Sequence, residues 1–139
     1  MKIEEVDFEK IQALIPKLFD IDEESYELKL RDHASIYTTF SILSSEAIKL
    51  MGRAEISLDK IVATKTKYAK VSSSKKLTVV DVNAIIDADD EVVEAKISLG
   101  DMTYKVNLLK GILRGLEHQK DCLVQISANK RKEKDLYIT

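Results

Sequence analysis

An apolar side chain recurs every three or four residues from Val92 to Leu123, and this repeat limits the possible folds more than any other feature. Nine of the ten positions at this spacing are apolar. A period of about 3.5 residues held over this length predicts a long helix that packs along one seam. The acidic segment 87–91 precedes the repeat, where the helix dipole favours negative charge, and Asp87 is the predicted N-cap. The ten positions are Val92, Ala95, Leu99, Met102, Val106, Leu109, Leu113, Leu116, Lys120 and Leu123.

A second repeat with the same period predicts another long helix, from about residue 23 to residue 68. Ten of its thirteen positions are apolar. Asp22 and Ser25 are both candidate N-caps of this helix. The thirteen positions are Tyr26, Leu30, His33, Tyr37, Phe40, Ser44, Ala47, Met51, Ala54, Leu58, Ile61, Lys65 and Tyr68.

Two shorter elements are expected outside these repeats. Residues 4–19 carry apolar side chains at helical spacing, and Glu4 and Glu5 suit the start of a helix. Pro16 lacks a backbone N–H, so we expect it to kink or end this helix. Between the two long helices, we expect a loop that leads into a short helical or extended segment at 79–86.

The composition supports an all-α fold: a short N-terminal helix and two long heptad-patterned helices that form an extended helical hairpin and oligomerise. One Pro and four Gly are too few for the many turns of an all-β sandwich. A length of 139 residues suits one helical domain spanning 1–139, with a polar C-terminal tail at about 128–139. The single cysteine, Cys122, and the lack of a long apolar stretch predict a cytoplasmic protein without a membrane segment.

Self-association is expected because a single hairpin buries only one face of each long helix. Gly100, Gly111 and Gly115 lie beside the seam of the C-terminal repeat, Val92 to Leu123, where they suggest the close approach of another backbone. We therefore predict a homo-oligomer built on the C-terminal repeat. The residues predicted to carry it are Val92, Leu99, Met102, Val106, Leu109, Leu113 and Leu116.

The segment 60–80, called here the basic elbow, contains six lysines and no acidic residue, although the whole chain has a net charge of -2. The charge is therefore segregated, since the remainder of the chain carries -8. Lysines interleaved with an aromatic residue suit single-stranded nucleic acid, where the lysines meet phosphates and the aromatic ring stacks on a base. A solvated lysine face is the alternative interpretation. The predicted nucleic-acid-binding residues are Lys60, Lys65, Lys67, Tyr68, Lys70, Lys75 and Lys76.

No catalytic residue, cofactor or metal site is predicted. The sequence contains no phosphate-binding glycine loop, no HExxH motif and no cysteine pair with metal-ligand spacing. His33 lies on the apolar seam, where a histidine is more often a packing residue than a catalyst. Asp89 and Asp90 could belong to a magnesium cluster, but helix capping accounts for them and their spacing matches no calcium loop.

Three groups of positions follow a pattern known from one family: Ala88, Asp89 and Val93 at the helix start, Gly115, Leu116, Gln119 and Lys120 near the end, and His33, Tyr37, Glu46, Lys65, Lys67, Tyr68 and Lys70 upstream. On these positions, residues 85–126 resemble the C-terminal half of the phage recombination mediators typified by UvsY, and the likeness extends over about 20–132. The resemblance implies a non-enzymatic mediator that binds single-stranded DNA as a homo-oligomer. It also implies a protein that helps a phage RecA-like recombinase load onto strands covered by single-strand-binding protein.

The sequence departs from the pattern of these mediators at three C-terminal places. Gln119 stands where an arginine is usual, Val124 and Gln125 where basic or amide residues are usual, and Asn129 near a usual aromatic. The alternative is a coiled-coil scaffold or assembly protein without a nucleic-acid role. The acid-free basic elbow distinguishes the two hypotheses, because a scaffold does not need it.

Overall fold

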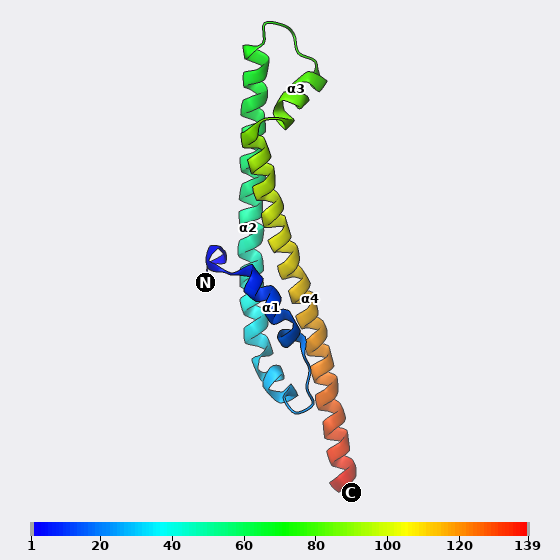
Figure 1. Cartoon of the computed structure of the whole chain (residues 1–139). Helices are drawn as coiled ribbons and strands as arrows, with labels where there is room; N and C mark the ends of the chain where they lie inside the picture. Colours follow the sequence, from blue (N-terminus) through cyan, green and yellow to red (C-terminus); the bar gives the residue numbers. More distant parts are fainter. Residues whose placement is uncertain (1, 139) are drawn as a thin grey trace. The chain divides into compact units, whose positions relative to one another are not determined.

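The computed structural model describes residues 2–138, and all regular structure within them is helical. A 3-10 helix, η1 (Ile3–Glu5), precedes four α-helices: α1 (Phe8–Phe19), α2 (Tyr26–Ser72), α3 (Val79–Asp87) and α4 (Asp90–Ile138). Figure 1 shows α2 and α4 as the two long helices, with α1 near the N-terminus and α3 between them in the chain. The predicted all-α fold with a pair of long helices is confirmed.

The ends of the helices correct several sequence predictions. The N-terminal helix begins at Phe8 rather than at Glu4, because the Asp7 side chain caps it by accepting from the N–H groups of residues 9 and 10. Pro16 does not end α1, which continues to Phe19. One proline removes a single donor, and this helix retains its packing on α4 through Phe19.

The caps of the long helices are also settled. α2 begins directly after Ser25, whose carbonyl accepts a hydrogen bond from the Lys29 amide. The Asp22 carboxylate instead accepts from the Glu24 amide within the preceding turn. The prediction of Asp87 as the cap of α4 was wrong, because Asp87 is the last residue of α3. Asp89 is the cap: its Oδ1 accepts from the amides of residues 91 and 92, at 3.0 and 3.3 Å.

The contacts divide the chain into two compact units. Unit 1 comprises residues 1–46 and 107–139, and unit 2 comprises residues 47–106. Each unit therefore contains a stretch of α2 and a stretch of α4. The single helical domain stays a prediction.

Unit 1 is held by hydrogen bonds between side chains and the main chain of distant segments. His33 on α2 donates from Nε2 to the Leu116 carbonyl on α4, at 2.7 Å. Gln119 on α4 donates from Nε2 to the Leu18 carbonyl in α1, also at 2.7 Å. The Ile3 amide donates to the Glu46 carboxylate at 2.9 Å, which fixes η1 on α2. His33 is therefore a packing residue, as predicted from its place on the seam.

Of the glycines beside the α4 seam, only Gly115 meets a close neighbour among the described residues. A Cβ at this position would lie 2.7 Å from the Phe19 ring of α1, whereas Gly100 and Gly111 have nothing within 4 Å. At Gly115 the close neighbour is a side chain rather than the expected backbone, and the approach of another backbone at Gly100 and Gly111 stays a prediction. Gly115 makes room for an aromatic side chain from the same chain, so this glycine serves the docking of α1.

The C-terminal repeat packs within the chain itself. Val92, Val106, Leu109 and Leu116 are almost completely buried, while Leu99, Met102 and Leu113 are half-buried. Their predicted role in oligomerisation stays a prediction. The predicted polar tail is helical through Ile138 as part of α4, and from residue 131 to residue 138 all its side chains are exposed. Within residues 2–138, no helix is long and apolar enough to cross a membrane.

Candidate nucleic-acid interface

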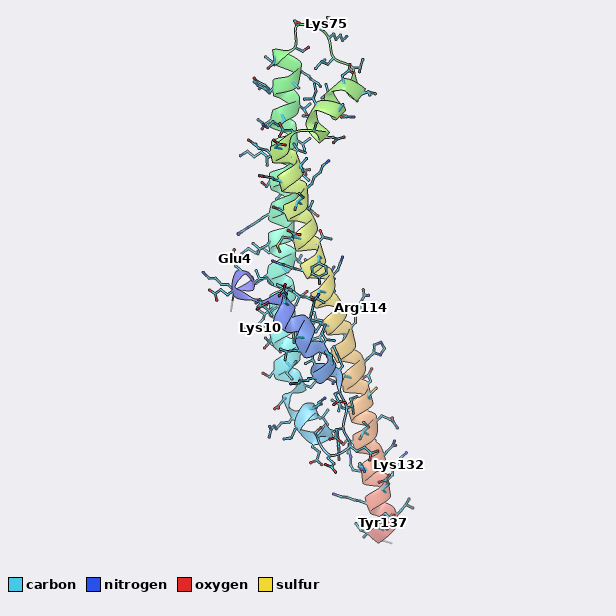
Figure 2. The ribbon with its side chains drawn as sticks, viewed as in Figure 1. Glu4, Lys10, Lys75, Arg114, Lys132 and Tyr137 are labelled. Atoms are coloured by element: carbon cyan, nitrogen blue, oxygen red, sulfur yellow. The ribbon has the colours of Figure 1, made fainter. Side chains whose placement is uncertain are left out.

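The basic elbow folds as the end of α2, a short loop and the start of α3, all within unit 2. Lys60, Lys65, Lys67 and Lys70 lie on α2, whereas Lys75 and Lys76 lie in the loop between α2 and α3. Figure 2 shows Lys75 in this loop. The expected short element at 79–86 is helical, as α3.

Two local hydrogen-bond patterns fix the course of the loop. Ser73 Oγ donates to the Lys75 carbonyl at 2.7 Å and accepts from the Lys75 amide, which closes a tight turn. Thr78 caps α3 in a capping box with Asp81, and the two Thr78 hydrogen bonds hold the pKa of the Asp81 carboxyl below its usual value. Ser73 is therefore part of a hydrogen-bonded turn between α2 and α3.

A small apolar core packs α3 and the loop of the basic elbow against α2 and α4. Val82 and Ile86 on α3 and Val92 on α4 are buried together. Four half-buried residues pack against them, of which three come from α2 and one from the loop: Leu58, Ile61, Val62 and Leu77. The loop that contains Lys75 and Lys76 is therefore anchored to the packed helices through Leu77.

Lys65 differs from the other lysines of the basic elbow, because it is paired within the fold. Its Nζ lies 3.3 Å from Asp89 Oδ2 and 3.7 Å from Glu91 Oε1, at the start of α4. The hydrogen bond to Asp89 raises the pKa of Lys65. Burial acts to raise the pKa of Asp89, but the hydrogen bonds from Lys65 and the Val92 amide outweigh it, so that pKa is lowered. Lys65 thus fixes α2 to α4.

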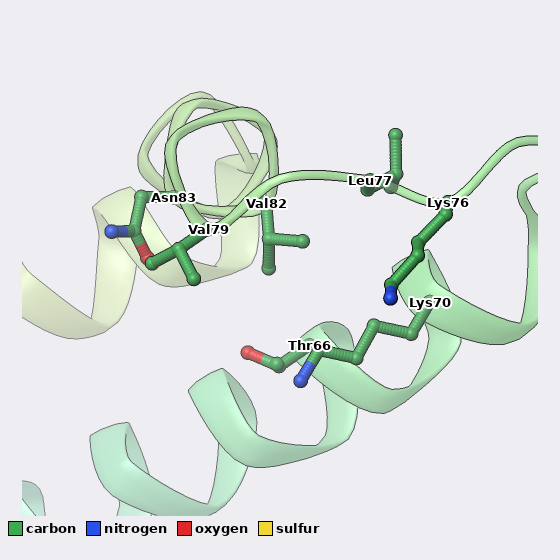
Figure 3. A pocket seen from close by; sticks show the side chains of 7 residues that line it. All are labelled: Thr66, Lys70, Lys76, Leu77, Val79, Val82 and Asn83. Carbon is green, nitrogen blue, oxygen red and sulfur yellow. The ribbon is translucent and has the colours of Figure 1, made fainter.

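One pocket beside the basic elbow brings together groups that suit a nucleotide. Its volume is about 460 Å³. Figure 3 shows the amino groups of Lys70 and Lys76 directed toward this space, with Val79 and Val82 across from them. Thr66 and Asn83 also line it, and in the described residues neither side chain has a hydrogen-bond partner. The pocket therefore combines two cations, an apolar wall and two free polar groups.

A second pocket, of about 370 Å³, contains the predicted stacking residue Tyr68. The side chain of Tyr68 is 71% exposed, because Ala69 rather than Tyr68 is buried in the last turns of α2. A seam of about 3.5 residues drifts around a helix of 3.6 residues per turn, so a repeat counted from Tyr26 loses the buried face by this point. The ring of Tyr68 is accessible for stacking. The other lining residues are Lys65, Ala69, Ser72, Ser73, Leu77, Ile85, Ile86 and Asp89.

The other five lysines of the basic elbow are exposed, and within residues 2–138 none of them forms an ion pair. They are Lys60, Lys67, Lys70, Lys75 and Lys76. Their charges are available to an external anion. The same residues 2–138 contain no group of three His, Cys, Asp or Glu that could hold a metal ion. Thr66 and Asn83 were missed by sequence reasoning, since neither carries a charge and only folding brings them to the lysines.

Three comparisons relate this geometry to known proteins. No family model matches the sequence, and no curated protein matches it. The fold is similar to the crystal structure of the recombination mediator protein UvsY of bacteriophage T4, with a TM-score of 0.79. The similarity covers 92% of this chain and 99% of the UvsY chain, at 16% sequence identity. The resemblance seen in the sequence is therefore confirmed at the level of the fold.

Proposed function

We propose that the chain is a non-enzymatic recombination mediator that binds single-stranded DNA through the basic elbow. The observation that carries this proposal is the set of five exposed lysines that form no ion pair within residues 2–138. Two of them line one pocket, and the exposed ring of Tyr68 lines a second. The similarity in fold to UvsY supports the same proposal.

A single strand fits these features better than a duplex does. Its bases are free to turn away from the backbone, so a ring such as that of Tyr68 can stack on them. The apolar wall formed by Val79 and Val82 offers a second place for a base, while Lys70 and Lys76 meet the neighbouring phosphates. A duplex keeps its bases stacked and would use the lysines alone.

The wider role follows from multivalent binding. Each protomer offers several weak lysine contacts. Once protomers are joined, the overall affinity for one strand rises steeply, because later contacts on the same strand are intramolecular. We propose a homo-oligomer that holds one strand on several basic elbows. In this form it would help a phage RecA-like recombinase to load onto a strand covered by single-strand-binding protein.

The test is the binding of a fluorescently labelled single-stranded oligonucleotide, followed by anisotropy over a range of salt concentrations. The variant combines Lys67→Ala, Lys70→Ala and Lys76→Ala. If each lysine meets a phosphate, the log–log salt slope should become shallower by about 2, from about 0.7 per contact. The variant should bind more weakly while keeping its helix content and its size in solution.

A matched control removes the same number of lysines elsewhere. Lys110, Lys120 and Lys134 are exposed on α4 outside the basic elbow, and their triple alanine variant should keep the wild-type slope. Equal slopes for the wild type and the Lys67, Lys70 and Lys76 variant would remove the basic elbow from the binding site. Absence of binding by the wild type at low salt would favour the coiled-coil scaffold instead.

A further inference from the structure

We propose that the binding surface for a single strand continues from the basic elbow along α2 to Arg53 and Lys49. This inference rests on the proposed single-strand binding and adds residues that lie outside the 60–80 segment. Both new residues are on α2 in unit 2, so the extended surface lies within one unit. The expected partner is a single-stranded polyanion that follows the axis of the helix.

The spacing of four cations places them on one face of α2. Lys49 and Arg53 are four residues apart, and the steps to Lys60 and Lys67 are seven residues each. At about 100° per residue, a step of four turns by about +40° and a step of seven by about -20°. All four side chains therefore fall within an arc of about 40°. They form one straight row along the helix.

Between residues 49 and 67 this face of α2 is free of acidic residues, although the sequence between the cations is not. Glu55 and Asp59 interrupt the basic residues in the sequence, and for this reason a count along the chain begins only at Lys60. On the helix they turn away from Lys60 by about 140° and about 100° respectively. A charge count along the sequence therefore conceals a basic face that the helix produces.

The same face points away from the apolar core of unit 2. Leu58 and Val62 pack against that core, and both lie about 160° around α2 from Lys60. Lys65, about 140° from Lys60, is directed toward α4 and pairs with Asp89. The row and the core thus occupy opposite sides of one helix, which explains why the fold leaves the row uncovered.

All four cations of the row are exposed and have no ion-pair partner in the described part of the chain, residues 2–138. Two apolar side chains share the face with them: Ile56 is 70% exposed and Val71 is 77% exposed. Cations that alternate with apolar groups suit a strand whose phosphates and bases both need contacts. A fully solvated lysine face would not need large apolar residues among its charges.

The length of the row suits a strand of several nucleotides. Lys49 and Lys67 are 18 residues apart, so the row spans about 27 Å at a rise of about 1.5 Å per residue. A stacked strand carries one phosphate per about 3.4 Å, and the row would thus follow about eight phosphates. The basic elbow alone would cover fewer.

The test compares two double variants by anisotropy with a labelled single strand across salt concentrations. Lys49→Ala with Arg53→Ala removes the extension, and Lys110→Ala with Arg114→Ala removes an exposed Lys–Arg pair of the same spacing on α4. Figure 2 labels Arg114 on α4. Loss of two phosphate contacts should make the slope shallower by about 1.4 in the first variant. The control should keep the wild-type slope.

Oligonucleotide length gives a second measurement. Over strands of up to about eight nucleotides, the length that one row covers, the wild type should gain affinity with each added nucleotide, and the Lys49 and Arg53 variant should gain less. Equal slopes and equal length dependence in the variant and the wild type would overturn the extension. An equal loss in the α4 control would also overturn it, because the effect would then reflect net charge alone.

The design separates failure of this inference from failure of the proposed function. If the wild type binds and the Lys67, Lys70 and Lys76 variant binds weakly, an unaffected Lys49 and Arg53 variant removes only the extension. If the wild type does not bind single strands at low salt, the proposed function fails and the extension fails with it.

Discussion

The two units use their polar side chains in opposite ways. In unit 1, His33, Gln119 and Glu46 each bond a main-chain group of a distant segment, so these polar groups are directed inward. In unit 2 an apolar cluster joins the helices, with Lys65 and Asp89 as the ion pair beside it, while Thr66 and Asn83 keep unused hydrogen-bonding groups. These three polar groups of unit 1 are therefore satisfied within the fold, whereas Thr66, Asn83 and the exposed lysines of the basic elbow in unit 2 are left for a ligand.

The units also differ in what covers α4. In unit 1, α1 lies against α4, with Phe19 over Gly115 and Ile15 beside the same surface. In unit 2, three large apolar residues of α4 are exposed in the single chain: Ile97 at 59%, Tyr104 at 51% and Val93 at 39%. An exposed apolar stripe on a helix is a common site of association. In unit 1 the exposed apolar residues of α4 lie farther along the helix, at Val124 and from Leu136 to Ile138. The stripe in unit 2 is therefore one place where a second protomer could bind without opening the buried seam.

The largest effect is expected from a large-to-small change on α4. Leu109→Ala in unit 1 should destabilise the chain by about 2–5 kcal/mol, since Leu109 is completely buried and the cavity would not refill. Ile97→Ala in unit 2 is the matched control and should change stability by less than about 0.5 kcal/mol. Urea denaturation measures both.

The same pair tests where protomers meet. If Ile97→Ala reduces the size of the particle in sedimentation and Leu109→Ala acts through unfolding, the contrast between the two units holds. Leu109→Ala could instead leave the free energy of unfolding unchanged and reduce the size of the particle in sedimentation. The buried seam would then be the site of assembly, as the heptad pattern alone suggested.

A moderate effect is expected from the inward-directed polar groups of unit 1. Gln119→Leu removes the donor to the Leu18 carbonyl at the end of α1, and the lost hydrogen bond should cost about 1–3 kcal/mol. Binding of single strands should stay at the wild-type level. Tyr37→Phe is the control, because it removes an exposed hydrogen bond to Glu117 and should cost less than about 0.5 kcal/mol. Weaker strand binding by the Gln119 variant would contradict the division of roles.

The smallest effect concerns the ion pair of unit 2 and its dependence on pH. The pKa of Asp89 is lowered in the fold, so its charge stabilises the fold above the ordinary aspartate pKa of about 3.9. This contribution is lost as the pH falls through the lowered value. The raised pKa of Lys65 means that its own contribution persists until the pH rises above about 10.4.

Asp89→Asn isolates this charge, because asparagine is as good an N-cap as aspartate. The wild type should be more resistant to urea than the variant at pH 7, and the difference should disappear as the pH falls well below 4. A difference that persists unchanged in acid would show that the cap geometry, rather than the charge, is responsible.

The heptad pattern predicted the long helices well, because a face that must be buried along its whole length leaves a regular trace in the sequence. The choice among several possible N-cap residues was harder to predict. Several acidic residues at 87–91 could each cap α4, and only the exact end of α3 selects Asp89 over Asp87. The docking of α1 depends on Phe19 meeting Gly115, which are far apart in the sequence.

The candidate site was predicted in composition but not in geometry. The acid-free segment defines the basic elbow, yet it could not tell that Lys65 turns toward Asp89 while Lys67, two residues later, faces solvent. That distinction depends on the rotation of α2 and on where α4 begins. Gln119, a departure from the pattern of the mediators, is explained by its hydrogen bond to Leu18.

The pairing of Lys65 with Asp89 has a consequence for how the sequence can evolve. A lysine that only meets phosphate can be exchanged for arginine or moved by a turn, since the partner is flexible and supplied from outside. Lys65 forms an ion pair with a carboxylate whose position is fixed on another helix. A neutral residue at position 65 would therefore leave Asp89 without its partner. The two positions would then change together across descendants of this chain, while the remaining lysines of the basic elbow would drift independently.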